Sequence, residues 1–334
     1  MSTLIAGYYG FDNVGDELLL TSVLHALRPT GRITVLSHRP ARTRLEHDVE
    51  SVSRWNPVSV LVALRRADRL VFGGGGIFQD KTSRRSLGYY LALLRAARIL
   101  GKPVTLCAVG VDPISSARLR NALGRALSGE TLEVSVRDDV SAAAVVACGA
   151  ARPAVAADLV FALPDEIGAP QATVDLLVVV RSAGARPREP WEWILEGALP
   201  RSWSTAMAAF QPGADARLSG ELASAFPQTS SLGVLQFGDA KAAVARASRV
   251  VSGRFHALVL AAKAGRPFAG VGADAKIESL CRAFGMPFLP MTAGEGETLE
   301  TLGRLASAPA PARATVERFR DGAAKALSSL AAHL

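Results

Sequence analysis

Short β-rich runs alternate with helical stretches along the chain, and this alternation constrains the fold more than any other feature. In the first half it predicts strands at 4–8, 33–36, 69–72, 104–109 and 133–136, with helices near 16–28, 57–66, 86–100, 115–128 and 139–148. Strands that alternate with helices of this length form βαβ units, and hence a parallel sheet covered on both faces. Ligands bind beyond the carboxyl ends of such strands, so the loops after them carry the functional information.

A polar stretch with proline and glycine interrupts this pattern near residues 163–170. We place the domain boundary there and predict domains at 1–165 and 166–334. The second alternation has predicted strands at 174–180, 234–237, 249–251 and 267–271, followed by a terminal helix from Ala312 that we expect to pack back on the first domain. The predicted fold class is α/β, with two doubly wound, Rossmann-like domains that face a cleft.

Composition narrows the class of protein. Hydrophobic residues make up 49% of the 334 residues, which is ample for two cores. No apolar run reaches the roughly 18 residues of a membrane span, and the N-terminus lacks a secretory signal, so we expect a cytoplasmic protein. The three cysteines have no metal-ligand spacing, which favours core thiols and predicts no metal site.

The formal net charge is +8. A basic balance suits nucleic acid, an anionic membrane surface or an anionic small substrate. The arginines are scattered, aromatic residues are few and no nucleic-acid motif is present, so we expect no nucleic-acid partner. An anionic substrate, or a peripheral contact with anionic lipid, is the better interpretation.

Two glycine-rich segments follow predicted strands in the first half: GYYGFDNVGDE at 7–17 and FGGGGIFQD at 72–80. Glycine permits tight turns and close approach of a ligand to the backbone, although each costs roughly 0.5–1 kcal/mol relative to alanine. Neither segment has the spacing of a dinucleotide or Walker motif. Asp16 is either a functional carboxylate or an acidic first-turn residue that satisfies free helix amides. The candidate ligand-binding residues of these two loops are Gly10, Asn13, Gly74, Gly75, Gln79 and Asp80.

Cationic side chains follow strands in both halves. Arg137 and Arg181 each end an apolar run, where a guanidinium can bind a carboxylate or phosphate in a bidentate manner or form an ordinary ion pair. In SGRFHALVLAA at 252–262, Arg254 and His256 lie at a predicted helix start, where an imidazole can exchange protons near neutral pH. Lys276 follows another strand and is either an anion-binding point charge or a solvated lysine.

Taken together and in this order, these motifs resemble the polysaccharide pyruvyl transferase family, particularly the bacterial cell-wall type that modifies polymers anchoring S-layer proteins. Besides the two glycine-rich segments, the resemblance rests on GKPV at 101–104, VRDDVS at 136–141, AADLVFAL at 156–163, Arg181, SGRFHALVLAAKAGRPFAGVG at 252–272 and Lys276. It spans nearly the whole chain. The family pattern has Leu where Phe255 stands and commonly has Pro where Ala275 stands, which affects loop shape and acceptor contacts without removing a reactive group.

The resemblance implies a fold like the two-domain glycosyltransferases of the B type. It also implies transfer of a pyruvyl group from phosphoenolpyruvate to a sugar diol, which forms a cyclic ketal and releases phosphate without a cofactor. The implied acceptor is similar to N-acetylmannosamine on a lipid-linked disaccharide, which a basic enzyme would meet at the inner membrane face. Whether the chain forms an oligomer stays open.

On this hypothesis Arg137, Arg254 and Lys276 bind phosphoenolpyruvate, with Arg181 as a weaker fourth cation. His256 is the candidate general acid, and Asp16 is the candidate base or sugar-orienting group. Two alternatives remain: a nucleotide-sugar glycosyltransferase of the same fold, although no nucleotide-ribose carboxylate is evident, and a non-catalytic protein that binds a sugar polymer. Thermal stabilisation by phosphoenolpyruvate or by nucleotide sugars distinguishes the first alternative, and phosphate release on mixing with acceptor excludes the second.

Overall fold

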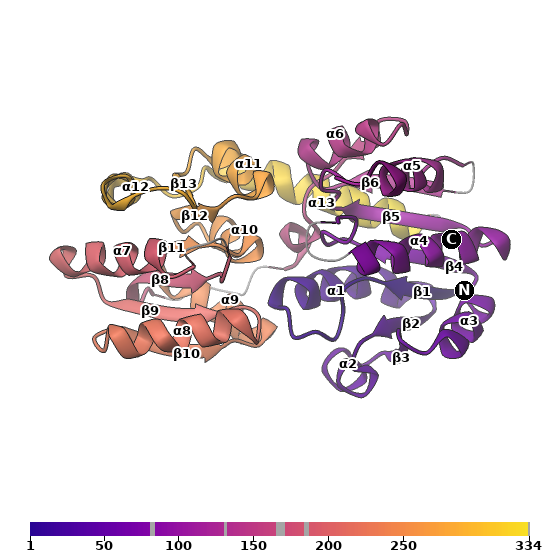
Figure 1. Cartoon of the computed structure of the whole chain (residues 1–334). Helices are drawn as coiled ribbons and strands as arrows, with labels where there is room; N and C mark the ends of the chain where they lie inside the picture. Colours follow the sequence, from indigo (N-terminus) through magenta and orange to yellow (C-terminus); the bar gives the residue numbers. More distant parts are fainter. Residues whose placement is uncertain (81–83, 130–131, 165–170, 184–186, 333–334) are drawn as a thin grey trace. The chain divides into compact units, whose positions relative to one another are not determined.

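The structure is a computed structural model that describes residues 1–80, 84–129, 132–164, 171–183 and 187–332. The chain forms two compact units (Figure 1). Unit 1 comprises Met1–Phe11, Asp16–Leu163 and Phe319–Leu334, and unit 2 comprises Asp12–Gly15 and Pro164–Arg318. The predicted boundary between residues 165 and 166 lies outside the described residues. No helix in the described part of the chain is both long enough and apolar enough to cross a membrane.

Unit 1 is built on a parallel sheet of seven strands in the order β3-β2-β1-β4-β5-β6-β7. The strands are β1 (Ser2–Ala6), β2 (Arg32–Ser37), β3 (Glu50–Ser53), β4 (Arg69–Gly73), β5 (Val104–Val109), β6 (Leu132–Val136) and β7 (Ala154–Val155). The α-helices between them are α1 (Val14–Leu27), α2 (Pro40–His47), α3 (Pro57–Arg66), α4 (Arg84–Ile99), α5 (Ala117–Ala126) and α6 (Asp139–Ala147), with 3-10 turns η1 (Arg28–Thr30) and η2 (Leu159–Ala162).

Both faces of this sheet are buried. Successive residues of a strand point to opposite faces, and Leu4 and Ile5 in β1 are both fully buried, as are Val71 and Phe72 in β4. The strand order reverses between β1 and β4, so the loops after these two strands lie at the position where doubly wound sheets bind ligands. Those loops are the two glycine-rich segments.

Unit 2 repeats the architecture with six parallel strands in the order β10-β9-β8-β11-β12-β13. Its strands are β8 (Val174–Val180), β9 (Thr205–Ala209), β10 (Ser230–Val234), β11 (Ala247–Ser252), β12 (Phe268–Gly272) and β13 (Phe288–Pro290). Its helices are α7 (Glu189–Ala198), η3 (Leu199–Arg201), α8 (Ala214–Ala225), α9 (Phe237–Ala245), α10 (Phe255–Lys263), α11 (Ala275–Phe284) and α12 (Glu295–Ser307). The order reverses between β8 and β11.

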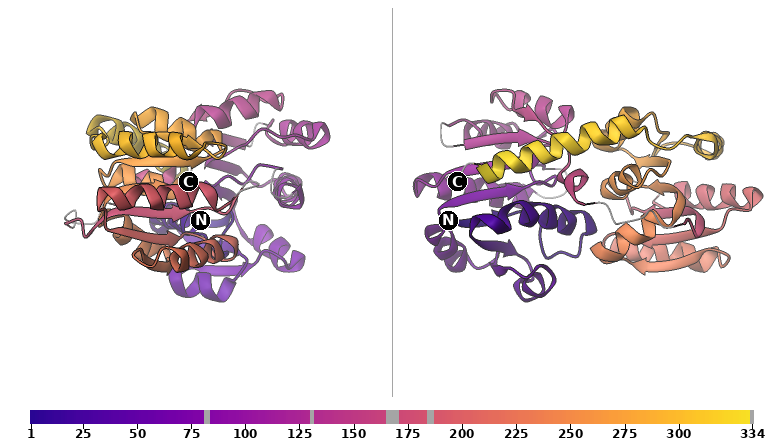
Figure 2. Two further views of the ribbon diagram at one scale, coloured as in Figure 1. Left: turned by 60° about the vertical axis from the view of Figure 1, so that its left-hand side comes forward. Right: turned by 180° about the vertical axis from the view of Figure 1, so that it is seen from behind.

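The last helix, α13 (Arg313–Ala332), is continuous (Figure 2). Its residues from Phe319 onward belong to unit 1, where the Phe161 and Phe319 rings lie 5.0 Å apart. Farther along, Arg69 Nη1 donates a hydrogen bond to the Leu330 carbonyl at 2.8 Å. The part of α13 from Phe319 to Leu330 is therefore packed within unit 1.

The doubly wound α/β architecture predicted from the sequence is confirmed in each unit. One strand prediction is wrong: residues 235–237 are not a strand, because β10 ends at Val234 and α9 begins at Phe237. The apolar residues of 234–237 therefore straddle a strand end and a helix start, and alternation alone could not separate them. Strands β3, β7, β9 and β13 were not predicted.

Candidate functional site

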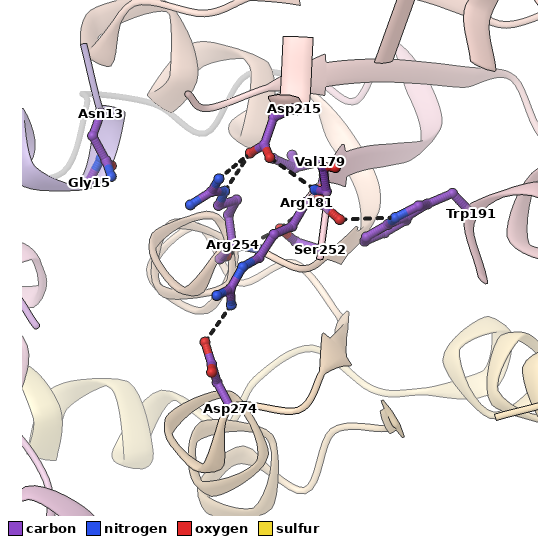
Figure 3. A network of polar contacts seen from close by, with 10 residues as sticks. Asn13, Gly15, Val179, Arg181, Trp191, Asp215, Ser252, Arg254 and Asp274 are labelled. Atoms are coloured by element: carbon purple, nitrogen blue, oxygen red, sulfur yellow. Dashed lines mark hydrogen bonds and ion pairs between the residues drawn. The ribbon is translucent and has the colours of Figure 1, made fainter. Parts of the chain in front are cut away.

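Polar side chains converge at the carboxyl edge of the unit 2 sheet, where the strand order reverses (Figure 3). Arg181 follows β8 directly, and Arg254 follows β11 and is the N-cap residue of α10. Lys276 lies in the first turn of α11, after β12. The sheet thus places three of the predicted anion-binding cations at one edge, on either side of its switch point.

Arg254 is held by Asp215, which lies in the first turn of α8. Arg254 Nε and Nη2 lie 2.6 and 2.5 Å from Asp215 Oδ2, and the Asp215 side chain is only 2% exposed. The second carboxylate oxygen accepts a hydrogen bond from the Ser182 backbone N–H at 2.9 Å. Because one buried carboxylate binds both the guanidinium and the loop after β8, it fixes the orientation of Arg254.

Arg181 and Lys276 share a different carboxylate. Arg181 Nη1 is hydrogen-bonded to Asp274 Oδ2, and Lys276 Nζ lies 3.9 Å from the same oxygen. These three side chains remain partly exposed, at 18–28%. An anionic ligand can therefore reach both cations, whereas Asp215 behind Arg254 is shielded from water.

The turn between β11 and α10 is closely packed against the end of β8. The Gly253 N–H donates to the Val179 carbonyl at 3.1 Å, and the Arg254 N–H donates to Ser252 Oγ at 2.8 Å. A Cβ at Gly253 would lie 2.7 Å from the Arg181 Cβ and 3.1 Å from the Trp191 ring, so only glycine fits. This packing brings Arg181 and Arg254 side by side.

His256 lies in the first turn of α10, beside the loop formed by residues 12–15. That loop belongs to unit 2, and the Val14 N–H donates to the Phe210 carbonyl at 3.0 Å. Asn13 Oδ1 accepts a hydrogen bond from the Gly15 N–H at 3.0 Å, and a Cβ at Gly15 would overlap His256 Nδ1. The glycine therefore leaves room for the imidazole, and the Asn13 side chain shapes the loop around it.

Unit 1 has its own cluster at the switch point between β1 and β4. Asp16, in the first turn of α1, is 9% exposed, and a Cβ at Gly75 would lie 3.0 Å from Asp16 Oδ1. Gly74 and Gly75 have φ angles of 75° and 80°, in the left-handed region that favours glycine. Burial raises the pKa of the Tyr9 phenol well above its ordinary value, and the neighbouring Asp16 charge adds to this effect.

The remaining loop residues contact the protein itself. The Gly10 N–H donates to Glu17 Oε1 at 2.8 Å, and the other Glu17 oxygen lies 3.1 Å from His47 Nε2. Asp80 accepts hydrogen bonds from the backbone N–H groups of Ser115 and Ser116 at 3.0–3.1 Å, which ties the loop after β4 to the start of α5. Gln79, beside Asp80, is partly buried.

Arg137 belongs to unit 1, whereas the other predicted cations belong to unit 2. Its side chain is 3% exposed and lies 3.1 Å from Asp138 Oδ2 and 3.8 Å from Asp158 Oδ2. A Cβ at Gly110 would lie 2.7 Å from Arg137 Nη2, so the chain passes close against the guanidinium. The ion pair with the neighbouring Asp138 that the sequence suggested is present, whereas anion binding by Arg137 stays a prediction.

The structure thus brings Arg181, Arg254, His256 and Lys276 together in unit 2, and Asp16, Gly74 and Gly75 together in unit 1. Sequence reasoning missed Asp215 and Asp274, the carboxylates that form ion pairs with the unit 2 cations. Asp274 stood within a recognised loop, between Gly272 and Lys276. Asp215 follows β9, and because that strand was not predicted its helix start went unnoticed.

The family model of polysaccharide pyruvyl transferases matches residues 13–274. A search of curated proteins gives no match.

Solved structures resemble the chain over nearly its whole length. The UDP-GlcNAc 2-epimerase from Methanocaldococcus jannaschii has a TM-score of 0.65 at 10% identity, with 98% of each chain covered. HepE from Anabaena, in complex with UDP and glucose, has a TM-score of 0.61 at 13% identity, covering 98% of this chain and 95% of its own. The Neisseria meningitidis epimerase bound to UDP-GlcNAc has a TM-score of 0.66 at 9% identity, with 99% of each covered. At these identities the likeness shows the fold alone, and it confirms the predicted similarity to the glycosyltransferase B fold.

Proposed function

The chain belongs to the polysaccharide pyruvyl transferase family, and we propose that it forms a cyclic pyruvate ketal on a sugar diol of a cell-wall polysaccharide precursor. The donor is phosphoenolpyruvate, and inorganic phosphate is released. The observation that carries the proposal is the group of three cations, Arg181, Arg254 and Lys276, beside His256 at one sheet edge.

This group suits phosphoenolpyruvate because the molecule carries both a carboxylate and a phosphate. Arg254, oriented from behind by Asp215, offers a fixed guanidinium for one of these groups. Arg181 and Lys276, which share the more exposed Asp274, offer two cations for the other. The N-terminal end of α10 adds its own partial positive charge.

His256 supplies the proton in the proposed mechanism. Protonation of the methylene carbon of phosphoenolpyruvate makes C2 electrophilic, and one sugar hydroxyl then adds to C2 and loses its proton to a base. The second hydroxyl displaces the phosphate at C2, gives its proton to the departing phosphate and closes the ketal; the protonated methylene carbon is the methyl group of the product. We assign the base, or the role of orienting the sugar, to Asp16 and a further anion contact to Arg137.

The proposal includes a lipid-linked acceptor that carries N-acetylmannosamine, on a precursor of a polymer that anchors an S-layer. It also includes a cytoplasmic enzyme that meets this acceptor at the inner membrane face, where the net charge of +8 favours anionic lipid. These assignments rest on the sequence motifs of the bacterial cell-wall type.

The test combines donor binding with product analysis. We expect phosphoenolpyruvate, and not UDP-GlcNAc, to raise the melting temperature, and mass spectrometry to show one added pyruvyl ketal on a synthetic lipid-linked disaccharide. We expect His256→Ala to lower turnover by about 10²-fold or more, as removal of a general acid does. The control His25→Ala removes an exposed imidazole on α1 and should leave turnover unchanged.

Two results would contradict the proposal. Stabilisation by UDP-GlcNAc alone would favour a nucleotide-sugar enzyme. Near wild-type pyruvyl transfer by the His256 variant would remove the acid from its assigned role.

A further inference from the structure

An unusual group of aromatic rings lies at the carboxyl edge of the unit 1 sheet. Tyr8 and Phe11 follow β1, His38 follows β2, Trp55 follows β3, and Tyr89 comes from α4. We call these five rings the aromatic shelf. Parallel strands place their carboxyl ends at one edge, which is why residues so far apart in the sequence meet here.

The rings of the shelf are ordered with respect to one another. Tyr8 stacks on Phe11 at 4.0 Å, and Phe11 stacks on His38 at 4.4 Å, with interplanar angles of 6° and 8°. Trp55 stands edge-on to Phe11 and His38, and its indole N–H donates to His38 Nδ1 at 2.7 Å. Trp55 is nevertheless 59% exposed, so one large ring is offered to a ligand.

A buried cation lies beneath these rings. Arg54 is 4% exposed, and its Cζ atom lies 4.4 Å from the Tyr89 ring centre and 5.2 Å from that of Trp55. Arg54 Nη1 donates to the Gly7 carbonyl at 2.8 Å. No carboxylate pairs with this guanidinium in the described part of the chain, so the aromatic faces and the carbonyl are what balance its charge.

Two polar atoms of this cluster are buried without a hydrogen-bond partner among the described residues: Arg54 Nε and Tyr89 Oη. Such atoms are costly in a folded protein and often indicate a ligand or water that completes them. Both are donors, and Tyr89 Oη also accepts, so the missing partner carries a hydrogen-bond acceptor such as an oxygen atom. A lipid tail or an apolar protein surface could not supply it.

We propose that the aromatic shelf binds a pyranose ring of the acceptor glycan, an inference that rests on the proposed function. The C–H face of the sugar packs against exposed Trp55, and a rotation of that side chain lets a hydroxyl or acetamido oxygen reach Arg54 Nε and Tyr89 Oη. A pyranose presents both surfaces at once, with C–H groups on its face and oxygen atoms at its edge.

The first test measures binding without chemistry. The probe is the methyl glycoside of N-acetylmannosaminyl-N-acetylglucosamine, titrated into the full chain by calorimetry, with saturation-transfer NMR to identify the sugar protons in contact. Trp55→Ala should weaken binding by about tenfold or more, as loss of a central aromatic contact does. The control Trp203→Ala removes a partly buried tryptophan of unit 2 that also lies under guanidinium groups, those of Arg201 and Arg249, and should bind as the wild type does.

The second variant separates binding from folding. Tyr89→Phe removes a buried hydroxyl that has no described partner, so it should raise the melting temperature while lowering glycan affinity several-fold. A purely structural role for the cluster predicts the higher melting temperature with unchanged affinity, and that result would overturn the proposal.

A lipid surface is the main competing occupant, because Val58, Leu61 and Val62 on the adjacent helix α3 are also exposed. Binding to vesicles of phosphatidylcholine with phosphatidylglycerol tests for contact with a lipid surface. If Trp55→Ala loses vesicle binding but keeps its glycan affinity, the aromatic shelf is a membrane contact and not a glycan site. The proposal is also rejected if the wild type does not bind the glycan at millimolar concentration. Pyruvyl transfer is measured in a separate assay. If the Trp55→Ala variant transfers pyruvate as well as the wild type does, the aromatic shelf is not the glycan site, but the proposed function stands. If the wild type binds the glycan through Trp55 but transfers no pyruvyl group, the proposed function is wrong, but the glycan site stands.

Discussion

At the scale of single residues, the unit 2 cluster differs from a simple patch of positive charge because its three cations are paired with two carboxylates of different exposure. Asp215 is 2% exposed and binds Arg254 through two nitrogens. Asp274 is 18% exposed and contacts Arg181 and Lys276. The buried carboxylate orients its partner, whereas the exposed one mainly balances charge until an anionic ligand arrives.

This difference gives opposite predictions for two variants that make the same change of charge. Asp215→Asn should weaken phosphoenolpyruvate binding by about 10- to 100-fold, the size expected for loss of an oriented charge-assisted contact. Asp274→Asn should leave binding unchanged or strengthen it, because it frees two cations. Calorimetry with both variants checks this, and a gain of affinity in both would mean that net charge alone governs the site.

Single site residues could be predicted from the sequence where both the residue type and its position after an apolar run indicated a side chain at the edge of a sheet. Arg181 and Arg254 end or follow continuous apolar runs, so their place at a sheet edge could be predicted from the runs alone. Asp215 could not be found in this way, because β9 has the sequence TAMAA, which lacks the β-branched and aromatic residues that mark a strand beyond its first threonine. The strand forms because it is buried between β8 and β10, and burial is a tertiary effect.

At the scale of elements, Asp80 in the loop after β4 connects the sheet of unit 1 to the start of helix α5. Burial by itself raises the pKa of this carboxyl, but the N–H groups of Ser116 and Ser115 and the nearby Arg84 charge lower it, and the net effect holds the pKa below its ordinary value. The carboxylate thus keeps the start of α5 in place. The sequence showed the glycine run before Asp80, but the contact with residues 35 positions away depends on the pairing of β4 with β5.

Because the pKa of Asp80 is lowered, the contribution of this carboxylate to the free energy of unfolding depends on pH. It is fully present above the unfolded-state pKa of about 3.9 and is lost as the pH falls through the lower pKa of the folded state. Asp80→Asn should therefore lower the melting temperature at pH 7 by about 2–4 °C, and the difference from wild type should shrink as the pH falls below about 4. Melting curves from pH 7 to pH 3 test this.

The control Asp48→Asn makes the same change of charge at a side chain that is 99% exposed. It should follow the wild type throughout. A pH-independent difference between Asp80→Asn and wild type would show that the carboxylate charge does not contribute.

At the scale of the whole molecule, both units have the same strand order at their cores, and short β-rich runs indicated core strands in each of them. All residues from Leu176 to Val180 in β8 are fully buried, as the continuous run predicted. The short strands β3, β7 and β13, of two to four residues, carry too little periodicity to be found from the sequence. Prediction therefore succeeds where a strand has a run of apolar and β-branched residues, and fails at the short edge strands and at β9, which is buried but composed mainly of alanine.

Helix α13 packs within unit 1 from Phe319 onward, and this packing is directly testable. Ala323, Leu327 and Leu330 form its buried stripe, and the Cys107 thiol lies 3.6 Å from the Ala326 carbonyl. Leu330→Ala should cost about 2–5 kcal/mol of unit 1 stability, because it leaves a cavity next to the Arg69 contact. Opening of the helix would then expose Cys107, whose pKa burial raises to about 12.

Thiol labelling followed by mass spectrometry reports this opening with an internal reference. Cys281 is buried in unit 2, so its labelling rate should not change in Leu330→Ala, while Cys107 should react faster. The control Ser329→Ala alters the exposed neighbour and should label as the wild type does. Equal acceleration at Cys107 and Cys281 would instead mean that the two units unfold together, because local opening of unit 1 leaves the core around Cys281 intact.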